Sequence, residues 1–188
     1  MTSGPNTTDL PDAELFSRDH FELFGLPRLF GMDERSLESR YHELQSSAHP
    51  DRYASRPEHE RRLSMQWSTR INEAYRLLRT PLTRARYLLE LEGIDVGAEN
   101  NTAMPADFLM QQMEWREALD EARDARDADA LDALARMLRQ ARRDAENLVA
   151  RQLDTEHDTV GAAATVRRMM FIARLGEDIA EAHETLEN

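Results

Sequence analysis

Cysteine and lysine are both absent from this chain of 188 residues. The lack of cysteine excludes disulfides, thiolate metal sites and cysteine nucleophiles. Glycine and proline occur only seven times each and aromatic residues make up 6%, which favours helices over a turn-rich β fold. No apolar run reaches membrane-spanning length, and residues 1–10 lack the basic and then apolar pattern of a signal peptide. We therefore expect a cytoplasmic protein with no membrane partner.

Acidic residues outnumber basic ones, and the net charge is −12. The imbalance is concentrated in residues 105–188, where 19 Asp and Glu residues oppose 11 arginines for a net charge of about −8. Such a surface repels a phosphate backbone, so we expect no nucleic-acid partner.

Apolar residues recur at helical spacing along most of the chain, which predicts an all-α protein. The predicted helical segments are residues 20–26, 33–49, 55–79, 80–93, 105–126, 128–154 and 159–187. Asp33 is a suitable N-cap for the second segment, and Ser55 with Glu58 forms a capping-box pattern at the start of the third. Short breaks between the last three segments favour a three-helix bundle.

Two regions poor in apolar periodicity divide these segments. Residues 1–18 are predicted to be a disordered lead, and residues 94–104 are predicted to be a linker. The linker would join a first domain at 19–93, built on a helical hairpin, to a second domain at 105–188.

The segment His49-Pro50-Asp51-Arg52 lies between two amphipathic helices whose apolar stripes must face each other. A short connection makes these helices antiparallel neighbours, so the segment is expected at the tip of a helical hairpin. Pro50 fixes φ and removes a backbone donor, which stiffens the tip. Taken alone, these residues also suit an ordinary polar loop, or a hydrolytic enzyme that uses His49 and Asp51.

The surroundings of this tripeptide favour another interpretation. Tyr41 and Leu44 precede it, and residues 71–78 (INEAYRLL) follow it. This arrangement resembles the J-domain of the DnaJ family. The resemblance implies that His49, Pro50 and Asp51 stimulate the ATPase of a seventy-kilodalton heat-shock chaperone.

Four further segments resemble one branch of that family, the HscB-type co-chaperones of iron–sulfur-cluster assembly. They are residues 21–27 (FELFGLP), 80–89 (TPLTRARYLL), 107–117 (DFLMQQMEWRE) and 165–171 (TVRRMMF). The resemblance implies a J-domain at 19–93, a scaffold-binding domain at 105–188 and no catalysis of its own. We expect no cofactor, and no metal because the histidines form no cluster with ligand spacing. The resemblance also implies two partners, an HscA-like ATPase chaperone and an IscU-like cluster scaffold.

The resemblance assigns residues to each partner. The residues expected to bind the chaperone are His49, Pro50, Asp51, Arg40 and Arg52. The residues expected to bind the scaffold are Leu109, Met110, Met113, Glu114, Glu117 and Phe171.

One departure concerns the helix before the loop, which carries a basic stripe in J-domains. In this chain the positions just before the loop are Ser46, Ser47 and Ala48. We therefore expect docking to draw on arginines after the loop. The candidates are Arg52, Arg56, Arg61 and Arg62.

Helical geometry at 105–126 separates two faces. Five residues share one stripe that suffices to pack a bundle: Phe108, Gln112, Trp115, Leu119 and Ala122. Leu109, Met110 and Met113 lie on the other side, where apolar residues need a second partner, and methionine is common on surfaces that adapt to one. The alternative is that these three residues pack against the first domain or the other two helices.

Two alternatives to the leading interpretation remain at this point. A general J-protein for misfolded clients would be expected to carry a Gly/Phe-rich linker and a zinc ribbon, and the sequence has neither. A hydrolytic enzyme would show turnover in the absence of any partner.

Overall fold

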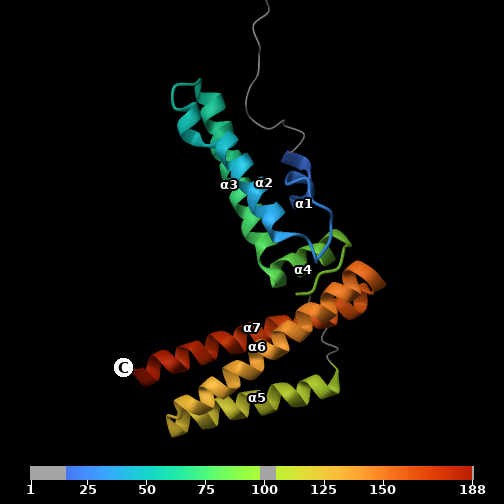
Figure 1. Ribbon diagram of the computed structural model, residues 1–188, viewed down its shortest axis with the longest axis vertical. Helices are drawn as coiled ribbons and strands as arrows, with labels where there is room; N and C mark the ends of the chain where they lie inside the picture. Colours follow the sequence, from blue (N-terminus) through green and yellow to red (C-terminus); the bar gives the residue numbers. More distant parts are fainter. Residues whose placement is uncertain (1–15, 98–104, 188) are drawn as a thin grey trace, which may run out of the picture. The chain divides into compact units, whose positions relative to one another are not determined.

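The computed structural model describes residues 16–97 and 105–187, and within those ranges the regular structure is entirely helical (Figure 1). The elements of the first half are α1 (His20–Leu23), α2 (Glu34–Ala48), the 3₁₀ turn η2 (Pro50–Tyr53), α3 (Glu58–Arg79) and α4 (Pro81–Leu91). Those of the second half are α5 (Ala106–Ala125), α6 (Ala128–Arg151), the π turn η3 (Gln152–Glu156) and α7 (Thr159–Glu187). The all-α prediction is confirmed.

The chain divides into two compact units, residues 1–84 and 85–188, and the division falls inside α4. Residues 98–104 of the expected linker lie outside the described residues. The part of it that is described is packed: Val96 is buried, and the N–H of Ile94 donates to the carbonyl of Leu89. The domain limits given above remain a prediction.

The first unit is built on the α2–α3 hairpin, whose two helices run side by side in Figure 1. Leu37 on α2 and a stripe on α3 are fully buried, and the stripe consists of Trp67, Ile71, Ala74 and Leu78. The carboxylate of Asp33 accepts hydrogen bonds from the backbone N–H groups of Arg35 and Ser36, so the predicted N-cap is confirmed. Helix α2 ends before Pro50, because a residue that precedes proline is pushed out of the α region.

Two local predictions in this unit are wrong. Helix α3 begins at Glu58 after Pro57 with no side-chain cap, so Ser55 and Glu58 form no capping box. The Glu58 carboxylate instead accepts a hydrogen bond from Arg62 at 2.7 Å.

The first helix is shorter than the predicted range of 20–26. Helix α1 ends at Leu23, because Gly25 adopts φ +62° and its N–H donates back to the carbonyl of Glu22.

The expected disordered lead has an ordered end. Residues 1–15 lie outside the described residues, but Phe16 packs edge-on against Trp67 with a centroid distance of 4.5 Å. The guanidinium of Arg70 lies over the Phe16 ring and donates to the carbonyl of Arg18. Residues 16–18 therefore belong to the surface of α3.

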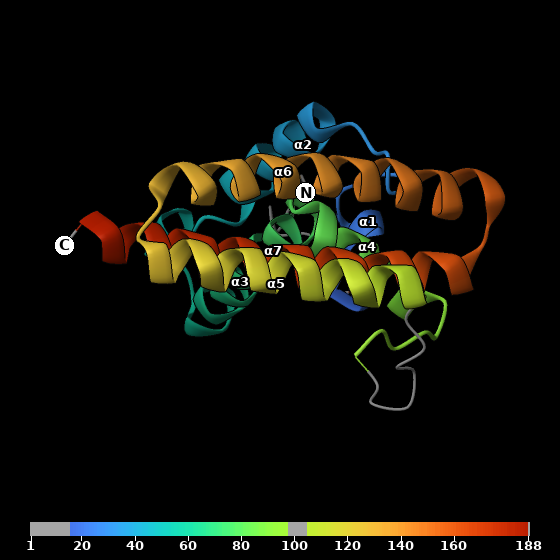
Figure 2. The same cartoon turned by 90° about the horizontal axis from the view of Figure 1, so that it is seen from below.

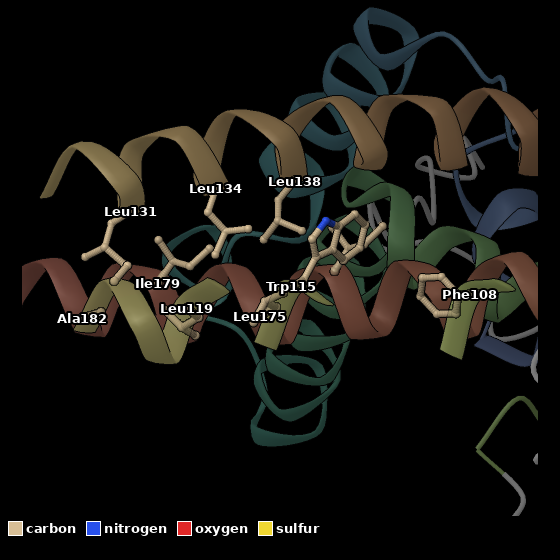
Figure 3. Close-up of a cluster of buried hydrophobic side chains, with 11 residues drawn as sticks. Phe108, Trp115, Leu119, Leu131, Leu134, Leu138, Leu175, Ile179 and Ala182 are labelled. Atoms are coloured by element: carbon tan, nitrogen blue, oxygen red, sulfur yellow. The ribbon is translucent and has the colours of Figure 1, made fainter. Parts of the chain in front are cut away.

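The second unit contains a three-helix bundle of α5, α6 and α7, which lie alongside one another in Figure 2. Leucines of α6 point toward α7, and Trp115 of α5 reaches the same cluster (Figure 3). The predicted stripe on α5 is confirmed at Phe108, Trp115, Leu119 and Ala122, which are at most 8% exposed. None of the helices in the described ranges is both long and apolar enough to cross a lipid bilayer.

Candidate functional site

The His49-Pro50-Asp51 loop occupies the end of the α2–α3 hairpin. His49 ends α2 and caps η2, and its Nδ1 accepts a hydrogen bond from the backbone N–H of Asp51 at 3.3 Å. The two side chains face solvent: that of His49 is 51% exposed and that of Asp51 is 91% exposed. The loop therefore presents the imidazole of His49 and the carboxyl group of Asp51 to a partner.

The loop is anchored on its inner side. The ring of Tyr53 is buried, and its hydroxyl donates to the carbonyl of Ser47 at 3.2 Å. Arg52 donates from its guanidinium to the carbonyl of Ser46 at 3.2 Å and from its backbone N–H to the carbonyl of His49. Together with the fixed φ of Pro50, these bonds hold the tip in one conformation. The sequence analysis did not predict this role of Tyr53.

The body of the hairpin is aligned by a polar cluster that the sequence did not indicate. The amide oxygen of Asn72 on α3 accepts from the hydroxyl of Tyr41 at 2.9 Å and from the amide of Gln45 at 3.1 Å. Ser68 donates to Gln45 at 3.3 Å, and the rings of Tyr41 and Tyr75 stack with centroids 4.0 Å apart. Because hydrogen bonds have defined directions, this cluster fixes the position of α2 along α3 and therefore the direction in which the loop projects.

Arg40 is not brought to the loop. It lies on α2 nine residues before His49, about 14 Å along the helix axis at 1.5 Å per residue. Its guanidinium contacts the carboxylate of Glu43 at 3.0 Å, and the last turn of α2 carries no basic residue. Of the residues expected to bind the chaperone, the structure groups His49, Pro50, Asp51 and Arg52 and separates Arg40 from them.

The exposure of the loop bears on its chemistry. Catalytic hydrogen-bonding groups act best in a site that excludes water, where their electrostatic effect is largest. His49 and Asp51 are open to solvent, and their side chains lie 3.7 Å apart at Nδ1 and Oδ2. This arrangement suits contact with another protein better than hydrolysis. Within residues 16–97 and 105–187, no group of three His, Asp or Glu residues could hold a metal ion.

A second surface of interest is the outer face of α5. Leu109 is 47% exposed, Met110 is 61% exposed and Met113 is 71% exposed. Glu114 and Glu117 are exposed on the same helix. We call these five residues the α5 outer face. It combines apolar side chains with two carboxylates, while the opposite stripe of α5 is buried in the bundle.

Phe171 has a different environment from the α5 outer face. Its ring stacks on Trp115 at 6.3 Å between centroids and meets Phe108 edge-on at 5.8 Å. The guanidinium of Arg116 covers the ring at 5.4 Å. Phe171 is partly buried at the border of the core cluster. Met169, in contrast, is 3% exposed and lies in the core.

Known proteins match nearly the whole chain. A curated relative from Azoarcus sp. (strain BH72), described as a co-chaperone protein HscB homolog, is 53% identical over 171 residues, which cover 91% of this chain and 97% of the relative. The chain belongs to the HscB family of co-chaperones. Residues 104–180 also match the family model described as the HSCB C-terminal oligomerisation domain.

Solved structures of HscB proteins agree with this assignment. The chaperone HscB from Vibrio cholerae is 35% identical with a TM-score of 0.77, and the match covers 90% of this chain and 99% of that one. The human co-chaperone HscB is 28% identical with a TM-score of 0.82, covering 96% and 92%. The resemblance to the HscB family is therefore confirmed, while the residue assignments stay predictions.

Proposed function

We propose that this HscB-family protein delivers an IscU-like cluster scaffold to an HscA-like ATPase chaperone and stimulates its ATPase during iron–sulfur-cluster assembly. The observation that carries the proposal is the presence of two solvent-facing contact surfaces in separate compact units. One is the anchored His49–Asp51 loop in residues 1–84, and the other is the α5 outer face in residues 85–188.

The loop supports the chaperone half of the proposal. A co-chaperone that acts by contact needs recognition groups held rigidly before the partner arrives, because ordering them on binding costs free energy. The bond from Asp51 to His49 and the anchoring of Tyr53 provide that order. In this proposal His49, Pro50, Asp51 and Arg52 contact the chaperone, and Arg40 supplies a more distant charge.

The α5 outer face supports the scaffold half. Leu109, Met110 and Met113 together place three exposed apolar side chains within two turns of one helix. Binding energy at an interface is concentrated in a few such side chains, and carboxylates at the rim add specificity. We assign Leu109, Met110 and Met113 as apolar anchors and Glu114 and Glu117 as their rim. Phe171 supports the surface from the bundle side.

The proposal is tested by steady-state ATPase of an HscA-type chaperone alone, with this protein, with an IscU-type scaffold, and with both. We expect each to stimulate, and both together to exceed the sum, because the co-chaperone brings the scaffold to its target. The L109A/M113A variant should keep the direct stimulation and lose the excess. If the stimulation by both proteins together only equals the sum of their separate stimulations, the proposal is contradicted. ATP hydrolysis by this protein alone would also contradict it.

A further inference from the structure

The α5 outer face also contains, we infer, a reversible modification site, at which hydrogen peroxide converts Met110 and Met113 to sulfoxides and so weakens the scaffold contact. This inference rests on the proposed function, and it makes scaffold delivery sensitive to oxidation. Cysteine is absent from the chain, so methionine supplies all of its oxidisable sulfur.

Solvent exposure separates the methionines of this chain. Met110 and Met113 are 61% and 71% exposed, whereas Met169 is 3% exposed and lies in the core. Susceptibility to oxidation follows exposure, because the oxidant must reach the sulfur atom. Two further methionines are also open to solvent, Met65 at 60% and Met137 at 51%. Exposure alone therefore does not single out the α5 outer face.

The charges one helical turn away distinguish Met110 and Met113. Glu114 follows Met110 by four residues and Glu117 follows Met113 by four, so each carboxylate neighbours a sulfur atom on the surface of α5. Both carboxylates are exposed, and neither has a hydrogen bond or ion pair with the described residues. The guanidinium of Arg116 on the same helix lies over an aromatic ring of the bundle instead. The two sulfur atoms therefore lie in a field of negative charge.

Met65 and Met137 have different neighbours. Arg61 and Arg62 precede Met65 by four and three residues on α3, so its sulfur is flanked by arginines, although Arg62 is paired within that helix. The positions three and four residues from Met137 on α6 carry no charged residue. Met65 thus matches Met110 in exposure and differs from it in the sign of the neighbouring charge.

The chemistry of oxygen transfer favours a sulfur atom beside a carboxylate. A sulfur lone pair attacks one peroxide oxygen, the O–O bond breaks, and the departing hydroxide takes the proton of the transferred oxygen and leaves as water. The sulfur loses two electrons and the peroxide gains two, so the step is balanced. Positive charge develops on sulfur during the attack, and a nearby carboxylate stabilises it, whereas a guanidinium opposes it. We therefore expect Met110 and Met113 to oxidise first.

Oxidation changes the contact that the α5 outer face can make. A sulfoxide replaces a flexible apolar thioether with a polar group that accepts hydrogen bonds. An acceptor buried at an interface without a donor weakens binding, and Glu114 and Glu117 beside it add further acceptors. Methionine sulfoxide reductases restore the thioether, one enzyme for each sulfoxide epimer, so the change is reversible.

The first measurement follows the oxidation of the full-length protein by hydrogen peroxide with peptide mass spectrometry. At low salt we expect Met110 and Met113 to oxidise at least about threefold faster than Met65, because the neighbouring charges have opposite signs. The ratio should fall toward one at about 1 M salt, where the Debye length is about 3 Å. Equal rates at low salt would overturn the inference.

The second measurement is calorimetric titration of an IscU-type scaffold, which is added after catalase has removed the peroxide. We expect oxidation to weaken binding at least about tenfold, because two apolar anchors become polar, and treatment with both reductases to restore it. The unfolding midpoint should not change, because both side chains face solvent. A large fall in the midpoint would assign the lost affinity to unfolding and reject the site.

Two variants are each compared with themselves before and after oxidation. M110L/M113L replaces the proposed site with side chains of similar volume that cannot be oxidised, and its affinity should not respond to peroxide. M65L/M137L is the matched control, because it removes the other two exposed methionines, and it should lose and regain affinity as the parent does. An oxidised parent that binds as tightly as before, or an equal loss in M110L/M113L, rejects the oxidation site alone. A parent protein that binds no scaffold before oxidation rejects the proposed function itself.

Discussion

Truncating the α5 outer face should lower scaffold affinity, whereas truncating Phe171 should lower stability, although the sequence predicts both for the scaffold contact. Leu109 and Met113 are 47% and 71% exposed, so L109A/M113A removes side chains that face water. We expect this variant to lose about 1 kcal/mol of unfolding free energy or less, because exposed substitutions change stability little and alanine suits a helix. Its scaffold affinity should fall by a factor of roughly 30 to 140, at about 1–1.5 kcal/mol for each of the two anchors.

Phe171→Ala acts on the core instead. The ring is partly buried and contacts Trp115 and Phe108. A fully buried phenylalanine costs about 3–5 kcal/mol on truncation, and each aromatic pair contributes about 0.5–1.5 kcal/mol. For a ring at the border of the core we expect a loss of about 2–3 kcal/mol. In a unit of this size that lowers the unfolding midpoint by roughly 10–20 °C.

The measurements are thermal unfolding followed by circular dichroism, and calorimetric titration of an IscU-type scaffold. Val160→Ala is the control, because Val160 is also apolar and 78% exposed but lies on α7 outside the assigned face. It should change neither quantity. If L109A/M113A lowers the unfolding midpoint as far as Phe171→Ala does, these side chains belong to the core. If it leaves scaffold affinity intact, the α5 outer face is not the contact.

Three further outcomes follow from the structure. Residues 105–188 expressed alone should fold, because they contain the whole core cluster from Phe108 to Ala182. The fragment should bind the scaffold without stimulating the chaperone, and an unfolded fragment would refute independent folding. Tyr53→Phe should lower maximal ATPase stimulation with an unchanged circular dichroism spectrum, because it removes the hydroxyl that bonds to Ser47 and keeps the buried ring. Undiminished stimulation would show that this anchor is dispensable. Hydrogen bonds from the Ser36 hydroxyl and the Arg35 N–H lower the pKa of Asp33, so its stabilisation of α2 is present at neutral pH and lost as pH falls through that lowered pKa. Asp33→Asn should lack this acid-dependent loss in unfolding curves between about pH 5 and pH 2, and identical curves would contradict the assignment.

The helices of this protein were largely predictable because their signals are local. Apolar spacing, the Asp33 cap and Pro50 each act within a few residues, and the structure places α2 and the bundle helices close to the predicted limits. The capping box predicted at Ser55 and Glu58 is absent. A local pattern does not reveal that the Glu58 carboxylate pairs with Arg62 and not with the backbone at the start of α3.

What the sequence did not predict depends on contacts between distant residues. The cluster around Asn72 joins positions up to 31 residues apart, and no local pattern marks it. The burial of Phe171 depends on how α5 packs against α7. That packing brings the Phe171 ring against the ring of Trp115 and under the guanidinium of Arg116.

The central claim is that an exposed loop activates a partner chaperone by contact. The most direct measurement is the maximal ATPase rate of an HscA-type chaperone at saturating parent protein and at saturating His49→Gln. The His49 side chain is 51% exposed at the hairpin tip, so this change should leave the circular dichroism spectrum and unfolding midpoint unaltered. We expect full stimulation by the parent and a rate with H49Q equal to that of the chaperone alone. A folded H49Q that stimulates as well as the parent would contradict it.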